Sequence, residues 1–183
     1  MPRSRMLVGS SLLRSAARWL LPWTLLSVLT ETGLSQEPPT KLREIPGGKQ
    51  FDFWVGEWEL TWPSGAGKNR ISFTLDSAVI MEEFSGEESM ALRGMSVSVF
   101  DARAGTWRQT WVDNQGGYLD FEGEFKDGRM ILQRSATVQE KSVLQRMVWD
   151  NITADSLDWS WERSDDQGQT WKTLWPIHYK RKR

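Results

Sequence analysis

Few side chains in this sequence could take part in catalysis or hold a metal. The chain has one histidine, His178, and no cysteine. Without cysteine there is no thiolate nucleophile, no disulfide and no Cys-ligated zinc or iron–sulfur site. One imidazole also rules out any site that needs two. His178 is therefore the only candidate imidazole ligand, and we expect neither a metal site nor a cofactor.

Carboxylates are the other candidates, because two of them across a cleft can act as general acid and base. Neighbouring residues on a strand point to opposite faces of the sheet, so adjacent carboxylates make poor catalytic pairs. The groupings are Glu82 with Glu83, Glu87 with Glu88, Asp165 with Asp166, and the alternating row Asp120, Glu122 and Glu124. The row is typical of a solvated outer face. We assign no catalytic residue.

Aromatic residues are the more distinctive feature, since 12 of the 183 residues are tryptophan. Each indole can bury about 150–250 Å² of surface, which suits a core or the wall of an apolar binding site. Lysine and arginine total 23 against 24 aspartate and glutamate residues. This near-neutral balance lacks the broad basic surface of nucleic-acid binding, so we expect no nucleic-acid partner.

The elements that position these indoles are predicted to be strands. From Phe51 onward apolar and polar residues alternate, with turn residues every 8–12 positions, and no amphipathic stretch is long enough for a sizeable helix. Asp127-Gly128, between two alternating runs, is a strong hairpin signal. The ten predicted strands span 54–62, 70–75, 79–85, 91–100, 106–112, 118–126, 129–137, 142–151, 156–163 and 170–180.

Short connections between successive strands require antiparallel neighbours, because a parallel pair needs a long crossover. A meander of ten strands leaves two exposed edges unless it closes on itself. We therefore predict an all-β protein whose domain, over 51–183, is a ten-stranded antiparallel up-and-down barrel. A two-sheet β-sandwich is the alternative.

The alternation also indicates which aromatic residues point into such a barrel. Trp107 shares a strand face with Trp111, and Trp159 shares one with Trp161. A barrel of about eight or more strands can hold one small ligand. The residues expected to line a small apolar or aromatic ligand are Trp107, Trp111, Phe121, Trp159, Trp161 and Tyr179.

The first 35 residues differ in composition from the rest. A leader with four arginines precedes an apolar run over 19–29, which is too short to span a bilayer and resembles the apolar region of a secretory signal peptide. We expect a signal peptide over 1–35, export to the periplasm or extracellular space, and no stable membrane anchor after cleavage. Residues 36–50 contain Pro38, Pro39, Pro46, Gly47 and Gly48, which predict a flexible tether.

The block FDFWVGEW at 51–58 resembles the opening of a large, mostly bacterial family of uncharacterised secreted proteins with a lipocalin-like (calycin) barrel. Residues 82–86, 107–114 and 179–181 fit the same family, so the resemblance covers about 51–181. It implies a barrel with a small-ligand site. It carries no established activity.

Gly56 and Trp58 form a G-x-W motif similar to the lipocalin opening, where the glycine lets the chain enter the first strand and the tryptophan plugs the closed end. Lipocalin-type barrels stack a C-terminal arginine over that tryptophan. Arg181 has the parity of the inward residues of its strand and would fill this role. We expect a structural role for all three residues.

Residues 164–171 match the Asp-box pattern S-x-D-x-G-x-T-W. In sialidases and other proteins this motif is a hairpin in which the aspartate caps backbone amides and the tryptophan packs beneath. A single copy in a short chain argues against a sialidase propeller. Asp166, Gly168 and Trp171 are therefore expected to be structural.

Nitrobindin-like barrels resemble the predicted architecture and hold haem through a histidine near the chain end. His178 makes haem an alternative, but it alternates away from the inward Ile177 and Tyr179. Three functions stay open: a binding module, an enzyme that uses interior polar groups for hydrolysis or isomerisation, and a filled barrel that acts through its surface. The size of the internal cavity distinguishes the filled barrel from the other two. The oligomeric state is also open.

Overall fold

The computed structural model of the protein describes residues 41–183. The signal peptide expected over 1–35 and residues 36–40 of the expected tether lie outside the described residues. Within the described part of the chain, no helix is long and apolar enough to cross a membrane.

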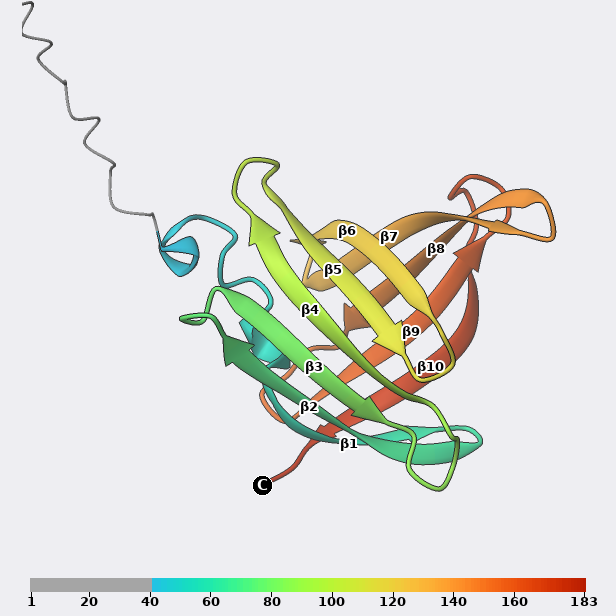
Figure 1. Cartoon of the computed structure of the whole chain (residues 1–183), viewed down its shortest axis with the longest axis horizontal. Helices are drawn as coiled ribbons and strands as arrows, with labels where there is room; N and C mark the ends of the chain where they lie inside the picture. Colours follow the sequence, from blue (N-terminus) through green and yellow to red (C-terminus); the bar gives the residue numbers. More distant parts are fainter. Residues whose placement is uncertain (1–40) are drawn as a thin grey trace, which may run out of the picture. The chain divides into compact units, whose positions relative to one another are not determined.

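The described residues form a closed barrel of ten antiparallel strands in up-and-down order (Figure 1). Each strand pairs with its neighbours in sequence, and β1 pairs with β10, which confirms the predicted barrel and removes the β-sandwich alternative. The strands are β1 (Gly56–Trp62), β2 (Gly65–Thr74), β3 (Val79–Ser85), β4 (Arg93–Asp101), β5 (Thr106–Asp113), β6 (Tyr118–Lys126), β7 (Arg129–Val138), β8 (Lys141–Asp150), β9 (Ser156–Ser164) and β10 (Lys172–Arg181).

The two ends of the barrel differ. We call the end with the β2–β3, β4–β5, β6–β7 and β8–β9 turns the closed end, and the end with the other five hairpins the open end. At the closed end the predicted Asp127-Gly128 turn is present, with φ of 51° and 78° at its two residues. Positive φ at both positions matches the twist of the strands on either side.

Strand β2 begins at Gly65, five residues before the predicted start at 70. The small residues there, expected to belong to a connection, continue the strand by pairing with Leu60, Thr61 and Trp62 of β1. A Cβ on Gly67 would stand 2.5 Å from the Ser85 carbonyl oxygen and 3.1 Å from the Trp62 ring. The missing side chain of Gly67 thus leaves room for the Trp62 indole.

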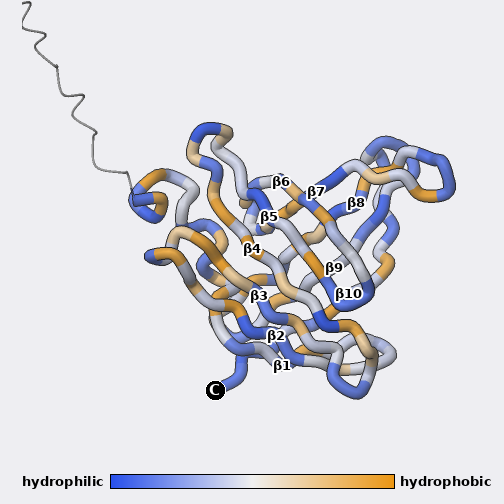
Figure 2. The backbone as a smooth tube through the Cα atoms, viewed as in Figure 1, coloured by the Kyte–Doolittle hydropathy of each residue, from blue (hydrophilic) through white to orange (hydrophobic). Residues whose placement is uncertain are grey.

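Side chains alternate between the interior and solvent, and hydrophobic and hydrophilic residues alternate along several strands of Figure 2. In β1, Trp58, Leu60 and Trp62 are buried, whereas the residues between them are exposed. The carboxylate row of β6, which is Asp120, Glu122 and Glu124, is exposed as expected of an outer face.

Residues 41–50 form ordered turns against the barrel rather than the flexible tether expected there. The 3₁₀ helix η1 (Leu42–Glu44) carries Arg43, whose guanidinium donates two hydrogen bonds to the Asp52 carboxylate at 2.8 and 2.5 Å. Ile45 packs on the core, and Gly47 lies against the Phe100 ring, where a Cβ would stand 2.5 Å away. The proline and glycines of this stretch form tight turns here. Because flexible tethers have the same composition, the sequence alone does not distinguish the two.

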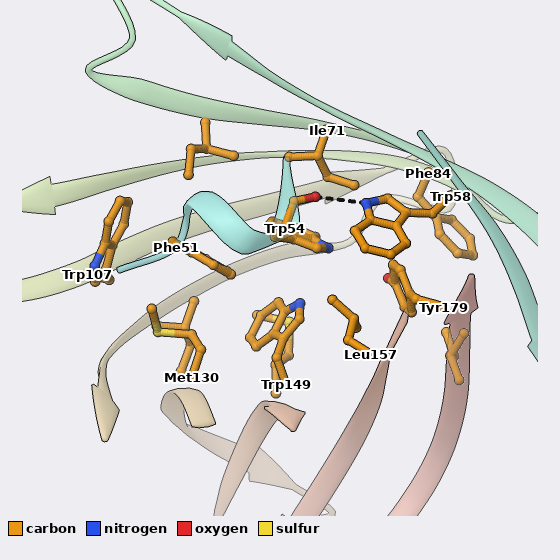
Figure 3. Close-up of a cluster of buried hydrophobic side chains, with 14 of the residues drawn as sticks. Phe51, Trp54, Trp58, Ile71, Phe84, Trp107, Met130, Trp149, Leu157 and Tyr179 are labelled. Carbon is orange, nitrogen blue, oxygen red and sulfur yellow. Dashed lines mark hydrogen bonds between the residues drawn. The ribbon is translucent and has the colours of Figure 1, made fainter. Parts of the chain in front are cut away.

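The chain then enters the closed end of the barrel through η2 (Asp52–Trp54) (Figure 3). Phe51 and Trp54 are 0% and 1% exposed, and their rings stack at 4.9 Å. Phe51 meets Trp107 edge-on at 5.4 Å and Trp149 at 5.0 Å. We call residues 51–54 the plug, because they fill the closed half of the interior.

Trp58 and Arg181 complete this end. The guanidinium carbon of Arg181 lies 4.0 Å from the Trp58 ring centroid, and the two residues are direct partners across the β1–β10 seam. Arg181 also donates hydrogen bonds to the carbonyl oxygens of Val55 and Phe53, at 2.8 and 3.0 Å. Gly56, at φ +146°, makes room, since a Cβ there would stand 2.1 Å from the Arg181 Nη1 atom. The expected stack is thus part of the barrel's closure.

Candidate ligand-binding site

The open half of the barrel contains a cavity of about 250 Å³. It extends from the β3–β4 connection and the end of β5, at the open end, to Trp149, which contacts the plug. Its lining residues are mostly aromatic and aliphatic: Glu82, Phe84, Leu92, Trp111, Asp113, Leu119, Phe121, Met147, Trp149, Trp159, Trp161, Trp175 and Ile177. We call this cavity the cup.

Four of the six expected ligand-binding residues line the cup. The set is Trp111, Phe121, Trp159 and Trp161. Residues that alternation did not assign to the site also line it, including Phe84, Trp149 and Trp175.

Trp107 and Tyr179 point inward as expected but do not line the cup. Trp107 is 2% exposed and packs against Phe51 and Phe100 in the closed half. Tyr179 packs edge-on against Trp58 at 5.8 Å. Alternation predicts whether a side chain faces inward, but it does not predict height along the barrel axis. The plug occupies the level at which these two residues lie.

The aromatic walls of the cup support one another through edge-to-face contacts. Trp175 meets Trp159 at 5.7 Å and Phe84 at 5.9 Å, with interplanar angles of 87° in both pairs. Phe121 and Trp161 are 5.7 Å apart at 84°. Such pairs add about 0.5–1.5 kcal/mol each beyond area burial. The walls are therefore held in place without a ligand.

Trp111 is positioned by its surroundings on two sides. Its indole Nε1 donates a hydrogen bond to the Asp113 carboxylate at 3.0 Å, and that carboxylate also accepts from the backbone amides of Gln115 and Gly117. The indole hydrogen bond and the Gly117 amide hold the pKa of Asp113 below its usual range. On the other side Gly94 leaves room, since a Cβ there would stand 2.1 Å from the Trp111 ring.

Glu82 of β3 is a buried carboxyl on the wall of the cup. It is 6% exposed and accepts hydrogen bonds from Asn69 Nδ2 at 2.7 Å and from Ser96 Oγ at 2.6 Å. Asn69 Nδ2 also donates to the Tyr179 hydroxyl at 3.1 Å. Loss of hydration raises the pKa of Glu82 to about 7, although the hydrogen bonds from Ser96 and Asn69 oppose that rise. The cup thus has one ionisable group in its interior that titrates near neutrality.

The sequence contains a signal that places Glu82 inside the barrel. Glu82 has the same parity as Ile80 and Phe84, which are both buried, whereas Glu83 points outward and pairs with Arg70. Because adjacent residues on a strand point to opposite faces, Glu82 and Glu83 do not form a catalytic pair, but one of the two must point inward. Following the alternation would have placed Glu82 inside the barrel.

The mouth of the cup is widened on one side. Strands β6 and β7 pair only from Glu122 with Gln133 to Lys126 with Arg129. Toward the open end they separate, and the β5–β6 and β7–β8 hairpins diverge (Figure 1). Phe121 lines both the cup and the surface hollow at this separation. Phe121 therefore separates the cup from this hollow on the β6–β7 side.

His178 and the Asp-box lie outside the cup. His178 is exposed on the outer face of β10, and its Nδ1 is 2.7 Å from the Asp158 carboxylate, so it does not fit a haem ligand inside the barrel. In the Asp-box, Asp166 accepts hydrogen bonds from the Thr170 hydroxyl and amide, at 2.6 and 2.9 Å. These bonds lower the pKa of Asp166 to about 2. Residues 41–183 contain no group of three or more acidic, His or Cys side chains that could hold a metal.

The other two Asp-box residues have structural positions as well. The Trp171 indole donates to the Gly168 carbonyl at 3.1 Å, and Gly168 has φ of +90°. Trp171 also lies under the Arg146 guanidinium at 3.9 Å. The motif forms the β9–β10 hairpin at the open end, beside the cup rather than in it.

No protein-family model matches the sequence, and no curated protein matches it.

Proposed function

We propose that the protein binds one small apolar or aromatic ligand in the cup. The observation that carries this proposal is the apolar cavity of about 250 Å³, walled by indoles and open at one end of the barrel. Apolar cavities of about 150 Å³ in protein cores bind benzene. The cup therefore suits a molecule with one or two rings, and it is too small for a long acyl chain to lie inside it.

The pre-formed walls support binding rather than a solely structural role. A filled barrel would bring its inward side chains into contact across the interior, as the plug does in the closed half. In the open half, Trp159, Trp161 and Trp175 are only partly buried, although they point inward. Leaving indole surface uncovered sacrifices hydrophobic stabilisation of about 25 cal/mol per Å². A ligand that covers these faces recovers it.

An enzyme is the less favoured reading of the same cavity. Ser96 Oγ donates to Glu82, but Glu82 in turn faces Asn69 and no imidazole or second carboxylate. Asp113, the other carboxylate of the cup, is held by a turn at the rim. Ser96 itself is 1% exposed and is not among the residues that line the cup, so its hydroxyl is not presented to a molecule in the cavity. The arrangement suits hydrogen bonding to a ligand better than proton transfer.

Export and family membership belong to the proposal too. The basic leader and short apolar run support a secreted protein that begins near Gln36. The FDFWVGEW opening supports kinship with secreted calycin-type barrels. N-terminal sequencing of exported protein tests the first point, and an intact Met1 would contradict it.

The binding proposal is tested by fluorescence titration with 4-nitrobenzyl alcohol, a neutral nitroaromatic that quenches indole emission on contact. We expect saturable quenching that ends at one probe per chain. Truncation of a cup wall in Trp161→Ala should weaken the affinity by about tenfold, since a lost aromatic contact with its area is worth about 1–2 kcal/mol.

Trp171→Ala is the matched control, because Trp171 lies outside the cup under Arg146. It should leave the affinity of the probe unchanged. Quenching that rises linearly without saturation, or equal losses in the two variants, would contradict a ligand site in the cup and favour the filled barrel.

A further inference from the structure

The charged residues that line the cup are all of one sign. Glu82 and Asp113 are acidic, and none of the other lining residues is basic. A ligand carrying a carboxylate or phosphate would enter a cavity that offers it repulsion and no cationic partner. The potential of the cup therefore favours cations over anions.

Glu82 has unused capacity to accept hydrogen bonds. An ionised carboxylate has about four acceptor positions on its two oxygens. Protein donors occupy one on each oxygen, from Asn69 to Oε1 and from Ser96 to Oε2. Positions remain for a donor that arrives from the cavity. A buried carboxylate is costly unless it is paired, so a cationic donor relieves that cost.

The walls of the cup add a second preference for positive charge. The faces of indole rings carry negative electrostatic potential, and they attract ammonium groups by about 0.5–2 kcal/mol for each good contact. Trp111, Trp159, Trp161 and Trp175 all line the cavity that contains Glu82. Cavities lined by aromatic rings are a recurrent way of binding ammonium groups.

We propose that the ligand of the cup is a small organic cation, an ammonium group attached to one or two apolar rings, whose charge pairs with Glu82. This inference rests on the proposed function, because it names the class of ligand that the same cavity takes. The rings lie against the indoles and the ammonium donates to the free positions of the carboxylate.

The pairing makes binding dependent on pH. The side chains facing Glu82 are Asn69 from β2, Ser96 from β4 and, through Asn69, Tyr179 from β10. Of these Tyr179 is titratable, and burial raises its pKa above the usual range, so it stays neutral. Asp113 lines the same cavity, and its pKa is lowered, so it stays charged. Glu82, whose pKa is about 7, is therefore the group that gains its charge between pH 6 and 8.

The test is calorimetric titration of the protein at pH 8 with three molecules of one size: 2-phenylethylamine, 2-phenylethanol and phenylacetate. We expect the amine to bind at least ~10-fold more tightly than the alcohol, and phenylacetate to bind most weakly, as expected for a hydrogen-bonded charge pair away from water. In Glu82→Gln, which keeps the shape and an acceptor oxygen, the amine should lose that preference and the alcohol should bind as before.

Glu83→Gln is the matched control, because Glu83 is the next residue on β3 but points outward to Arg70. It should leave all three affinities unchanged. A second readout needs no variant: on lowering the pH from 8 to 6, the affinity for the amine should fall several-fold while that for the alcohol stays constant. The amine itself stays protonated over this range, as a lysine side chain does.

Two results would overturn the inference and leave the binding proposal standing. One is an alcohol that binds as tightly as the amine. The other is a preference for the amine that survives in Glu82→Gln or does not change with pH. If none of the three molecules binds, the proposed function fails and this inference fails with it.

Discussion

The two halves of the barrel use the same kind of residue for different ends. In the closed half, Trp54 and Trp58 are each 1% exposed; Trp54 stacks on Phe51, and Trp58 packs edge-on against Tyr179. In the open half, Trp161 and Trp175 also point inward but border a cavity of about 250 Å³. The difference arises from the plug, which fills one half of the interior and has no counterpart in the other.

Tryptophan content alone therefore does not decide whether a barrel is filled. A large number of indoles is consistent with a solid core, yet here the closed half is solid and the open half is hollow. The closed half should therefore contribute most of the stability, and the open half should contribute binding.

The largest effect is expected for Trp58→Ala in the closed half. Removing a fully buried indole should lower the free energy of unfolding by about 3–5 kcal/mol, as other large-to-small core substitutions do. Urea denaturation followed by far-UV circular dichroism measures the change. A smaller decrease in the free energy of unfolding than that caused by Trp161→Ala in the open half would contradict a solid closed half and a hollow open half.

The second effect is a dependence of stability on pH that belongs to the open half. Burial raises the pKa of Glu82 from 4.5 to about 7. Because its pKa is raised in the folded state, the folded protein holds the Glu82 proton more tightly than the unfolded chain does. The contribution of this proton to the free energy of unfolding is fully present below about pH 4.5 and is lost as the pH rises through 7. The free energy of unfolding lost by pH 8 is on the order of 3 kcal/mol, at about 1.4 kcal/mol per pKa unit.

Glu82→Gln removes this titration, so its stability between pH 5 and 8 should vary less than that of the unaltered protein. The difference between the two curves cancels the contributions of the titratable groups that both proteins share. Parallel curves from denaturation at each pH would show that Glu82 is not buried in the cup as described.

The third effect concerns the seam between β1 and β10. Arg181→Ala should lower the free energy of unfolding by about 1–3 kcal/mol, since it removes the stack on Trp58 and leaves carbonyl groups of residues 53 and 55 without their donor. In a double-mutant cycle with Trp58→Ala, the coupling energy should be about 0.5–2 kcal/mol. Strict additivity would mean that the two side chains do not support each other.

The smallest effect on stability is expected for Trp161→Ala, at about 1–2 kcal/mol, because its ring is only partly buried. The same substitution is expected to weaken ligand binding, and Trp58→Ala, where enough folded protein remains, is not. Equal unfolding losses for Trp58→Ala and Trp161→Ala would indicate a cup that is packed as tightly as the closed half.

Much of the fold is predictable from the sequence because alternation is a direct consequence of strand geometry. All ten strands were expected, and the Asp127-Gly128 turn and the Trp58–Arg181 stack lie where their motifs indicate. The start of β2 was missed because the residues that let strands approach closely, such as Gly67, are also turn formers.

The site is predictable in part for a different reason. Alternation assigned Trp111 and Trp161 to the interior correctly, but it assigned Trp107 and Tyr179 to the same wall although they lie at the level of the plug. Height along the barrel axis depends on strand tilt and register, which no single strand reveals. The docking of residues 41–50 ahead of the plug could not be foreseen, because a glycine- and proline-rich segment has the same composition whether it packs on the barrel or stays free.

The most direct test of the division into a solid and a hollow half is NMR of the indole N–H groups during titration with 2-phenylethanol. We expect saturable shifts of the indole N–H resonances of Trp111, Trp161 and Trp175, and no change at Trp58 or Trp107. Each resonance is assigned with a Trp→Phe variant. Shifts that reach Trp58 and Trp107 as strongly as the cup, or no saturable shift at any indole, would contradict this division.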